Sequence, residues 1–271
     1  MSVKKGIIIS DLHCGGQTGL TPPEWRYNVV RNAKNPSVKK KNKVAKLQKE
    51  VWEWYVAQAK SLGPLDFMLV NGDCIDGSGK INAGVEQIDT DTNIQCAMAV
   101  ESLEQFKLRK GAKIVMTYGS AYHTGKDSDH EDIIASALNA DIGSHKWVDI
   151  NGCVFDLKHV VGRSSVPHTK GTALAREWLV NELWALKGLT PKTDVYIRSH
   201  VHYPWYCGDP SVPFLAMTTP ALQWGTAYGS RSCTGTVDMG FIYFEINDKG
   251  EYTWQYRIAH LESQRALAVK V

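Results

Sequence analysis

Short groups of aspartate and histidine recur along the chain, and each follows a stretch rich in β-forming residues. Carboxylates and imidazoles are the oxygen and nitrogen ligands that divalent metal ions take from proteins. Because the tips of neighbouring strands bring distant parts of a sequence to one place, these groups predict one shared metal site. The groups are Asp11-Leu12-His13, Gly72-Asp73-Cys74-Ile75-Asp76, Gly119-Ser120-Ala121-Tyr122-His123, His159 and Ser199-His200-Val201-His202.

Spacing within two of the groups favours paired ligands. In an extended segment, residues two apart point to the same side, so Asp11 and His13 are expected to hold one ion together. The same spacing would place His200 and His202 in one pocket. Asp73 follows a predicted strand and a glycine, where its two oxygens can bridge two ions. Each piece alone is a weak signal, and their joint occurrence is what predicts a dinuclear site.

Hydrophobic periodicity predicts the elements that position these groups. Short β-rich runs alternate with helical patterns in the first half, which is typical of buried parallel strands. Two facing sheets with helices on their outer faces can accommodate this order of strands and helices. The predicted strands are 6–10, 65–71, 112–118, 154–160, 195–199, 214–219, 241–246 and 252–258, and the predicted helices are 44–62, 92–109, 131–140 and about 172–187.

Composition narrows the class of protein. The 271 residues are 43% hydrophobic, enough for the core of a single domain, and a net charge of +3 does not indicate a general polyanion-binding surface. None of the six cysteines forms a C-x-x-C pair, so a zinc finger is excluded and reduced thiols are expected. Cys14 and Cys74, inside the metal motifs, are predicted to be packing residues. No apolar run approaches the roughly 20 residues that span a bilayer, so a cytoplasmic location away from membranes is predicted.

Taken together, the five groups resemble the signature of the calcineurin-like metallophosphoesterase superfamily: Asp-x-His, Gly-Asp-x-x-Asp, Gly-Asn-His-Asp/Glu, a lone His, and Gly-His-x-His. The resemblance spans residues 11–202. The opening residues 10–15 and 19–23 are also similar to phage and prophage members of that group. The resemblance implies a four-layer α/β/β/α sandwich of two facing mixed sheets. On this interpretation residues 1–271 form one domain, with a basic loop and helix insertion at about 20–62.

The resemblance also implies a ligand set for two divalent ions. The first ion would be held by Asp11, His13 and His202, and the second by His159 and His200, with Asp73 bridging them. Asp76 would be a supporting residue.

The third motif departs from the superfamily pattern, because Gly119 is followed by Ser-Ala-Tyr-His and the metal-binding Asn is missing. Either His123 takes the coordination position of that Asn, or it keeps the role of general acid while Ser120 or water fills the gap. For the fourth motif, His159 is preferred over His168, because His159 ends a strand-like run whereas His168 follows a proline in a loop.

An Asp- and His-rich site suits Mn²⁺ first, and also Fe, Zn, Ni or Co, better than Mg²⁺ or Ca²⁺. A water shared between two such ions would be hydroxide at neutral pH and would attack phosphorus in line. His123 is the candidate acid for the leaving oxygen. Arg163 and Arg198 are candidates to bind phosphate, with an ordinary ion pair as the alternative.

The leading hypothesis is therefore a metal-dependent phosphoesterase whose substrate is a phosphate ester. Phosphodiesters, including nucleotides and nucleic acid, are preferred because the basic segment 31–49 and an aromatic rim after His202 could hold both sides of a linked phosphate. The simpler interpretations are that the basic segment is a solvated surface and that the aromatic residues pack against the sheet. The rim residues are Tyr203, Trp205, Tyr206, Trp224 and Tyr228.

Two alternatives stay open at this point. One is a phosphomonoesterase acting on a small metabolite or phosphoprotein. The other is a catalytically silent scaffold that binds metal and partners. The sequence does not indicate an oligomeric state.

Overall fold

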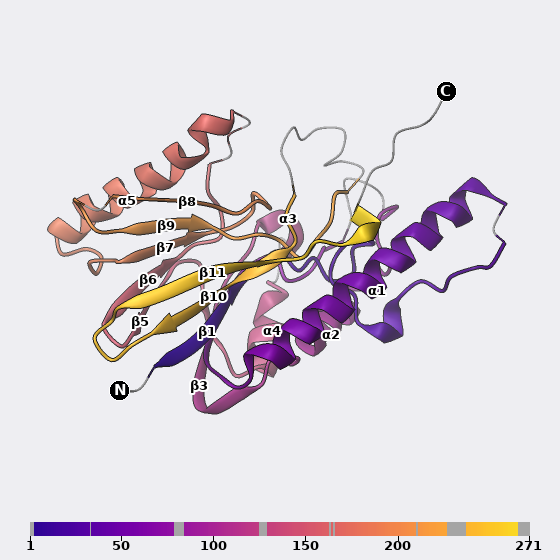
Figure 1. Ribbon diagram of the computed structural model, residues 1–271, viewed down its shortest axis with the longest axis horizontal. Helices are drawn as coiled ribbons and strands as arrows, with labels where there is room; N and C mark the ends of the chain where they lie inside the picture. The colour runs from indigo at the N-terminus through magenta and orange to yellow at the C-terminus, as the bar shows by residue number, and fades with distance from the viewer. Residues whose placement is uncertain are drawn as a thin grey trace.

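The strands form two mixed sheets that face each other (Figure 1). The structure is a computed structural model that describes residues 3–32, 34–78, 84–124, 129–162, 164, 166–209, 211–226 and 237–264. The first sheet has the order β11-β10-β1-β2-β3-β4 and the second β5-β6-β7-β9-β8. The first comprises β1 (Lys4–Ile9), β2 (Leu65–Asn71), β3 (Leu108–Thr117), β4 (Asp141–Gly143), β10 (Gly240–Ile246) and β11 (Tyr252–Ile258); the second comprises β5 (Lys146–Ile150), β6 (Cys153–Leu157), β7 (Val195–Arg198), β8 (Trp205–Gly208) and β9 (Leu215–Thr218).

The strands that carry the Asp and His groups are the parallel ones. In the first sheet β1, β2, β3 and β4 run parallel, and in the second β6, β7 and β9 do. Parallel strands end at the same edge of a sheet, so the residues that follow β1, β2 and β3 come together there. The residues after β6 and β7 do the same in the facing sheet.

Helices cover the outer face of each sheet, which completes four layers. Helices α1 (Pro36–Leu62), α2 (Thr92–Leu103) and α4 (Glu131–Ala137) pack on the first sheet, and α5 (Lys170–Leu186) packs on the second. The remaining elements are α3 (Ala121–Thr124) and the 3-10 turns Pro23–Trp25, Pro167–Thr169 and Glu262–Gln264. The predicted α/β/β/α sandwich of mixed sheets is confirmed.

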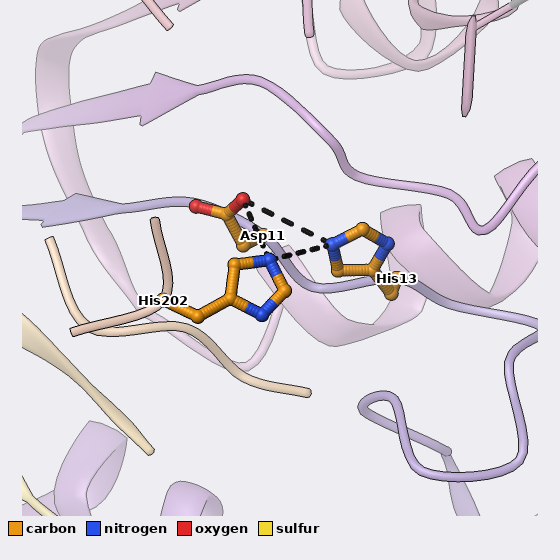
Figure 2. A group of neighbouring side chains, drawn as sticks. All are labelled: Asp11, His13 and His202. Atoms are coloured by element: carbon orange, nitrogen blue, oxygen red, sulfur yellow. Dashed lines mark hydrogen bonds and ion pairs between the residues drawn. The ribbon is translucent and has the colours of Figure 1, made fainter. Parts of the chain in front are cut away.

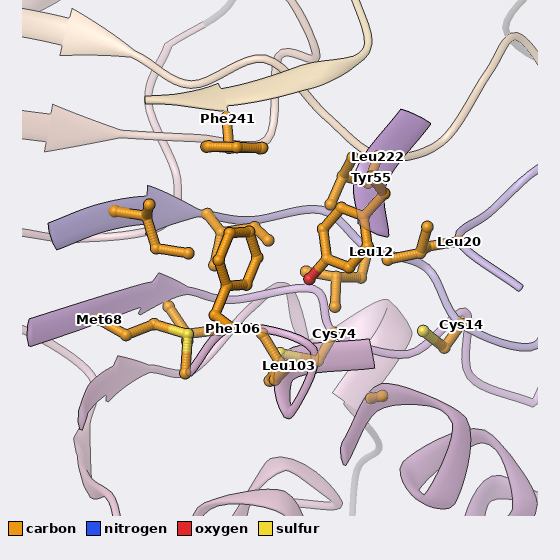
Figure 3. Close-up of a cluster of buried hydrophobic side chains, with 14 of the residues drawn as sticks. Leu12, Cys14, Leu20, Tyr55, Met68, Cys74, Leu103, Phe106, Leu222 and Phe241 are labelled. Atoms are coloured by element: carbon orange, nitrogen blue, oxygen red, sulfur yellow. The ribbon is translucent and has the colours of Figure 1, made fainter. Parts of the chain in front are cut away.

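Alternating side chains of the central strands fill both interlayer spaces. Ile7 and Ile9 point to the helices, and Ile8 between them points to the second sheet. On the helix side, Tyr55 of α1 and Phe106 make an edge-to-face contact near Phe241 (Figure 3). Because these strands are buried on both faces, they read as continuous apolar runs.

The same helix-side cluster settles the predicted role of two cysteines. Cys14 and Cys74 are fully buried within it (Figure 3), and burial raises the pKa of Cys14 to about 12. Packing is therefore their role, as predicted. The five described cysteines are free.

Helix α1 is longer at its start than the periodicity predicts. Pro36 occupies the first helical turn, and the Asn35 side chain caps the helix by accepting a hydrogen bond of 2.8 Å from the backbone N–H of Ser37. Residues 39–41 and Lys43 are exposed, while the later turns bury Val51 and Tyr55. Lys46 and Lys49 pair with glutamates one turn on, as on a solvated helix face. The insertion at about 20–62 and the single domain remain interpretations.

Some predicted boundaries were wrong. The helix expected over 92–109 ends at Leu103, because Leu108 already pairs with Leu65 as the start of β3. The helix expected to reach residue 140 ends at Ala137. Strands β4, β5 and β8 and helix α3 were not predicted; each has five or fewer residues, too few to show a period. None of the described helices is both long and apolar enough to cross a membrane.

Candidate metal centre

The candidate ligands follow the strands in left-handed backbone conformations. Eight non-glycine residues of the described chain have positive φ; three are Asn, which tolerates this region, and the other five are all predicted ligands. The expectation that Asp11 and His13 pair along an extended segment was therefore wrong: the chain turns sharply at both. The five are Asp11 (φ 51°), His13 (45°), Asp73 (53°), His200 (71°) and His202 (58°).

Asp11, His13 and His202 form a first group of facing ligand atoms (Figure 2). The Nε2 atoms of His13 and His202 are 3.2 Å apart, and Asp11 Oδ1 lies 3.2 Å from His202 Nε2 and 3.9 Å from His13 Nε2. Burial would raise the pKa of Asp11, but the charges of His202 and His159 lower it to about 2. The three atoms therefore surround one point with one oxygen and two nitrogens.

Asp73, His159 and His200 form a second group. His159 Nε2 lies 2.9 Å from Asp73 Oδ2, and the His159 Nδ1–H donates to the Asn71 carbonyl at 2.6 Å, so Nε2 is the nitrogen turned to the site. His200 Nδ1 is 3.9 Å from the same Asp73 oxygen, and its side chain is 42% exposed. Burial raises the pKa of Asp73, but the charge and hydrogen bond of His159 hold it well below its usual value.

Asp73 also lies in a third set of facing atoms, with His13 and His123. It is therefore the carboxylate between the two groups. Its Oδ1 accepts hydrogen bonds from Ser120 N–H at 2.7 Å and Ser120 Oγ at 3.1 Å.

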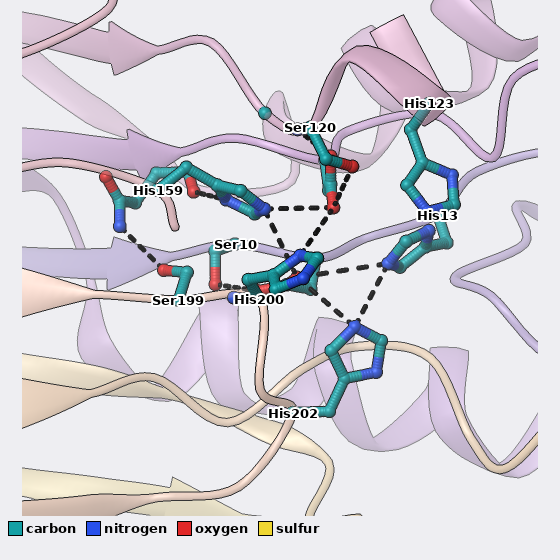
Figure 4. A network of polar contacts seen from close by, with 12 residues as sticks. Ser10, His13, Ser120, His123, His159, Ser199, His200 and His202 are labelled. Carbon is teal, nitrogen blue, oxygen red and sulfur yellow. Dashed lines mark hydrogen bonds and ion pairs between the residues drawn. The ribbon is translucent and has the colours of Figure 1, made fainter. Parts of the chain in front are cut away.

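His123 lies on the side of the first group. Its ring centroid is 4.4 Å from that of His13, and its Nδ1–H donates to the Asp76 carbonyl at 2.9 Å. Figure 4 shows His123 and His159 on opposite sides of the network. Burial, with the charge of His13, lowers the pKa of His123, which favours the neutral ring.

A buried chain of hydroxyls lies under Asp11, and sequence reasoning did not identify it. Asn71 Nδ2 donates to Ser199 Oγ at 2.6 Å, Thr219 Oγ1 lies 2.8 Å from Ser199 Oγ, and Ser10 Oγ lies 2.6 Å from Thr219 Oγ1 (Figure 4). Ser10 Oγ then donates to Asp11 Oδ2 at 2.6 Å. The available signal was a polar residue at the end of each apolar strand.

Two further carboxylates support the site from outside. Glu131, which is fully buried, accepts hydrogen bonds from the backbone N–H of Cys74 at 2.9 Å and of Gly119 at 2.6 Å. Asp76 Oδ1 lies 3.5 Å from His13 Nδ1 and accepts a bond from Gln223. Asp76 thus lies beside a predicted ligand, and its supporting role stays a prediction.

A divalent cation fits this arrangement. Asp11 Oδ1 is buried and has no hydrogen-bond partner, while Oδ2 of the same carboxylate is bonded to Ser10. An unpartnered oxygen amid imidazole nitrogens is what a cation would satisfy. The number and identity of bound metals stay predictions.

Other predicted residues lie elsewhere. The role of Arg198 as a phosphate ligand is not supported: its guanidinium is 1% exposed and pairs with Asp156 at 2.6 Å and Glu177 at 3.1 Å. Arg163 lies outside the described residues. His168 is exposed in a 3-10 turn and, among the residues that the structure describes, belongs to none of the three sets.

Among the described aromatic residues after His202, Tyr203 and Trp224 pack, as in the simpler interpretation, whereas Trp205 and Tyr206 are exposed. The ammonium of Lys170 lies over the ring of buried Tyr203 at 4.2 Å, and Tyr206 contacts Trp254. Trp224 packs against the helix-side cluster, and Tyr228 lies outside the described residues.

Comparison with known proteins gives a general likeness of fold. No protein-family model matches the sequence, and no curated protein matches it significantly. Among solved structures, zinc-bound Vps29 from Entamoeba histolytica is 12% identical, with 94% of this chain and 98% of that chain covered and a TM-score of 0.41. A predicted phosphoesterase from Streptococcus pneumoniae is 10% identical (95% and 99% covered, TM-score 0.39). An archaeal phosphodiesterase is 15% identical (93% and 99% covered, TM-score 0.39). These values are too low to transfer a function.

Proposed function

We propose that this protein is a metal-dependent phosphoesterase of the calcineurin-like metallophosphoesterase class, with two divalent cations at the first and second groups. The observation that carries the proposal is the convergence of two aspartates and four histidines, from strands of both sheets, around the unpartnered Asp11 Oδ1. Mn²⁺ is the preferred ion, and the likeness to phage members and the cytoplasmic location remain predictions from sequence.

The residues of the chain would divide the work as follows. Asp11, His13 and His202 would hold one cation, His159 and His200 would hold the other, and Asp73 would contribute to both positions. When bound, the cations supply Lewis acidity to the phosphoryl oxygens and lower the pKa of a coordinated water.

The remaining side chains orient these ligands. The Ser120 hydroxyl and N–H fix the Asp73 carboxylate, and the Asn71 carbonyl fixes the ring of His159. Such outer contacts keep the ligand atoms aimed before a substrate arrives, which is how a rigid site lowers the cost of reaching the transition state.

Within this class we propose phosphodiesters as the preferred substrates. The exposed lysines at the start of α1 form a basic surface, which could bind a further phosphate group of a phosphodiester substrate. The alternative is a phosphomonoesterase. A comparison of diester and monoester substrates distinguishes the two activities.

The test compares hydrolysis of bis(p-nitrophenyl) phosphate and p-nitrophenyl phosphate by Mn²⁺-loaded protein. Asp73→Asn and His200→Ala should each lower kcat/KM by at least 10³-fold, because each removes a proposed ligand. Lys60→Ala, on the far end of α1, is the matched control and should leave the rate unchanged. Hydrolysis that persists in both site variants would sink the proposal, and metal binding without any hydrolysis would favour a scaffold.

A further inference from the structure

The first and second groups each contain three ligand residues, but they differ in how well those residues are buried. Asp11 and His13 of the first group have side chains no more than 2% exposed, and His202 is 20% exposed. In the second group, the side chain of His200 is 42% exposed. Affinity for a cation rises with the number and rigidity of its ligands.

His123 adds a ligand atom on one side only. It shares a set with His13 and Asp73, while His159 and His200 share their set with Asp73 and not with His123. The position of His123 is fixed by the bond from its Nδ1 to the Asp76 carbonyl and by the close approach of Gly77, where an added Cβ would lie 2.6 Å from the His123 carbonyl oxygen. With Nδ1 donating, Nε2 keeps the lone pair that a cation needs.

Beside the second group, the side chain of Ser120 contacts Asp73. Its hydroxyl lies 3.1 Å and 3.2 Å from the two Asp73 oxygens and already donates to that carboxylate. A neutral hydroxyl in this role is a weak ligand compared with an imidazole or an amide carbonyl. The second group therefore offers three ligand residues, one of them half exposed.

We propose that the two metal positions load unequally: the position of the first group, completed by His123, fills first and tightly, and the position of the second group is a low-affinity site. This inference rests on the proposed function. If so, the fraction of protein molecules that carry two ions depends on the free metal concentration. The inference also assigns His123 as a metal ligand of the first position.

The test is titration of metal-free, full-length protein with Mn²⁺ by isothermal calorimetry, with electron paramagnetic resonance to detect coupled ion pairs. Two binding steps whose dissociation constants differ by at least tenfold are expected, with the coupled signal appearing only in the second step. His200→Ala should remove the weak step alone. Two steps of equal affinity would overturn the inference while leaving the phosphoesterase proposal intact, whereas no binding at all would overturn both.

Three variants test which ligands make the two positions differ. His123→Asn keeps a donor for the Asp76 carbonyl but removes Nε2, so it should weaken the tight step at least tenfold; weakening of the weak step instead would overturn the assignment of His123. Ser120→Asn offers an amide oxygen to the second position and should tighten the weak step at least fivefold. Ser120→Ala, the matched control, offers no ligand and should not tighten it. No change with Ser120→Asn would overturn the explanation from ligand number.

Discussion

At the scale of single residues, the site concentrates backbone strain. Five ligand candidates take left-handed conformations, at a cost of about 1–3 kcal/mol each. Such strain persists only where surrounding contacts over-determine the backbone. Here the backbone N–H of His13 bonds to the Asp73 carbonyl at 3.1 Å and that of Asp11 to the Gly72 carbonyl at 3.0 Å. These bonds hold the backbone at Asp11 and His13 in place.

Substitution of Ser10 tests whether the hydroxyl chain orients the Asp11 carboxylate. Ser10→Ala removes the 2.6 Å bond to Asp11 Oδ2 and leaves Thr219 with one partner fewer. Mn²⁺ affinity should fall about 10- to 100-fold, as for other contacts that orient metal ligands. Stability should fall by about 1–3 kcal/mol, because buried polar atoms lose a partner.

The measurements are calorimetric titration and urea unfolding of the metal-free protein. Ser61→Ala, on the exposed end of α1, serves as the control. Unchanged metal affinity in Ser10→Ala would show that the hydroxyl chain does not orient Asp11.

At the scale of elements, helix α4 ties together the loops that follow β2 and β3. Its first residue, Glu131, gives one oxygen to the N–H after Asp73 and the other to the N–H before Ser120. Burial, with the charge of Asp73, raises the pKa of Glu131 to about 7. The two oxygens of Glu131 nevertheless supply one acceptor to each of these N–H groups.

Glu131→Gln should therefore damage the site although it conserves shape. Glutamine has one acceptor oxygen, and its NH₂ would face an N–H group. Mn²⁺ affinity should drop about 10- to 100-fold. Calorimetry checks this against Asp132→Asn, an exposed neighbour in the same helix turn. Equal affinities in the two variants would contradict the role of α4.

Helix α5 is joined to the second sheet through a buried ion pair. Arg198 of β7 binds Asp156 of β6 and Glu177 of α5. Burial would raise the pKa of Asp156, but the hydrogen bond from His145 and the charge of Arg198 lower it. This group therefore contributes stability above its unfolded pKa, and that contribution is lost as the pH falls through its lower folded value.

Asp156→Asn should cost about 3–5 kcal/mol at pH 7, because it leaves a buried guanidinium without its closest charge partner. The difference from the unsubstituted protein should shrink as the pH is lowered below the folded pKa of Asp156. Urea unfolding at several acidic pH values measures it. A difference that stays constant down to pH 2 would contradict the assignment of the pKa shift.

At the scale of the whole molecule, the site lies where the two sheets meet. Asp11, His13 and Asp73 follow strands of the first sheet, whereas His159, His200 and His202 follow strands of the second. A cation held by both sets would link the sheets across the interlayer core. Metal binding should therefore stabilise the entire fold.

Mn²⁺ at about 100 times its dissociation constant should add about 2.7 kcal/mol, which raises Tm by about 5–10 °C in a protein of this size. Scanning calorimetry with Mn²⁺ and with EDTA measures the shift. The double variant His200→Ala/His202→Ala should show almost none of it. An equal shift in that variant would place the stabilising ion elsewhere.

Much of the architecture follows from local pattern. The apolar run 65–71 became β2 with the expected bounds, because a strand buried between layers must be apolar along its length. The run 252–258 became β11 with the expected bounds although it is an edge strand, because its polar and apolar residues alternate. Short edge elements such as β4 and β8 escape such reasoning, because their pairing with neighbours decides them and their period is too brief to detect.

The sequence by itself determined which residue types are available as ligands and that they follow strands, because type and order along the chain are local properties. Only the tertiary structure decided that His123 lies beside His13, that Arg198 faces α5 and that Glu131 joins two loops. Those outcomes depend on how the sheets face each other and on left-handed turns at the strand ends. Both arise from contacts between residues far apart in the chain, which spacing does not reveal.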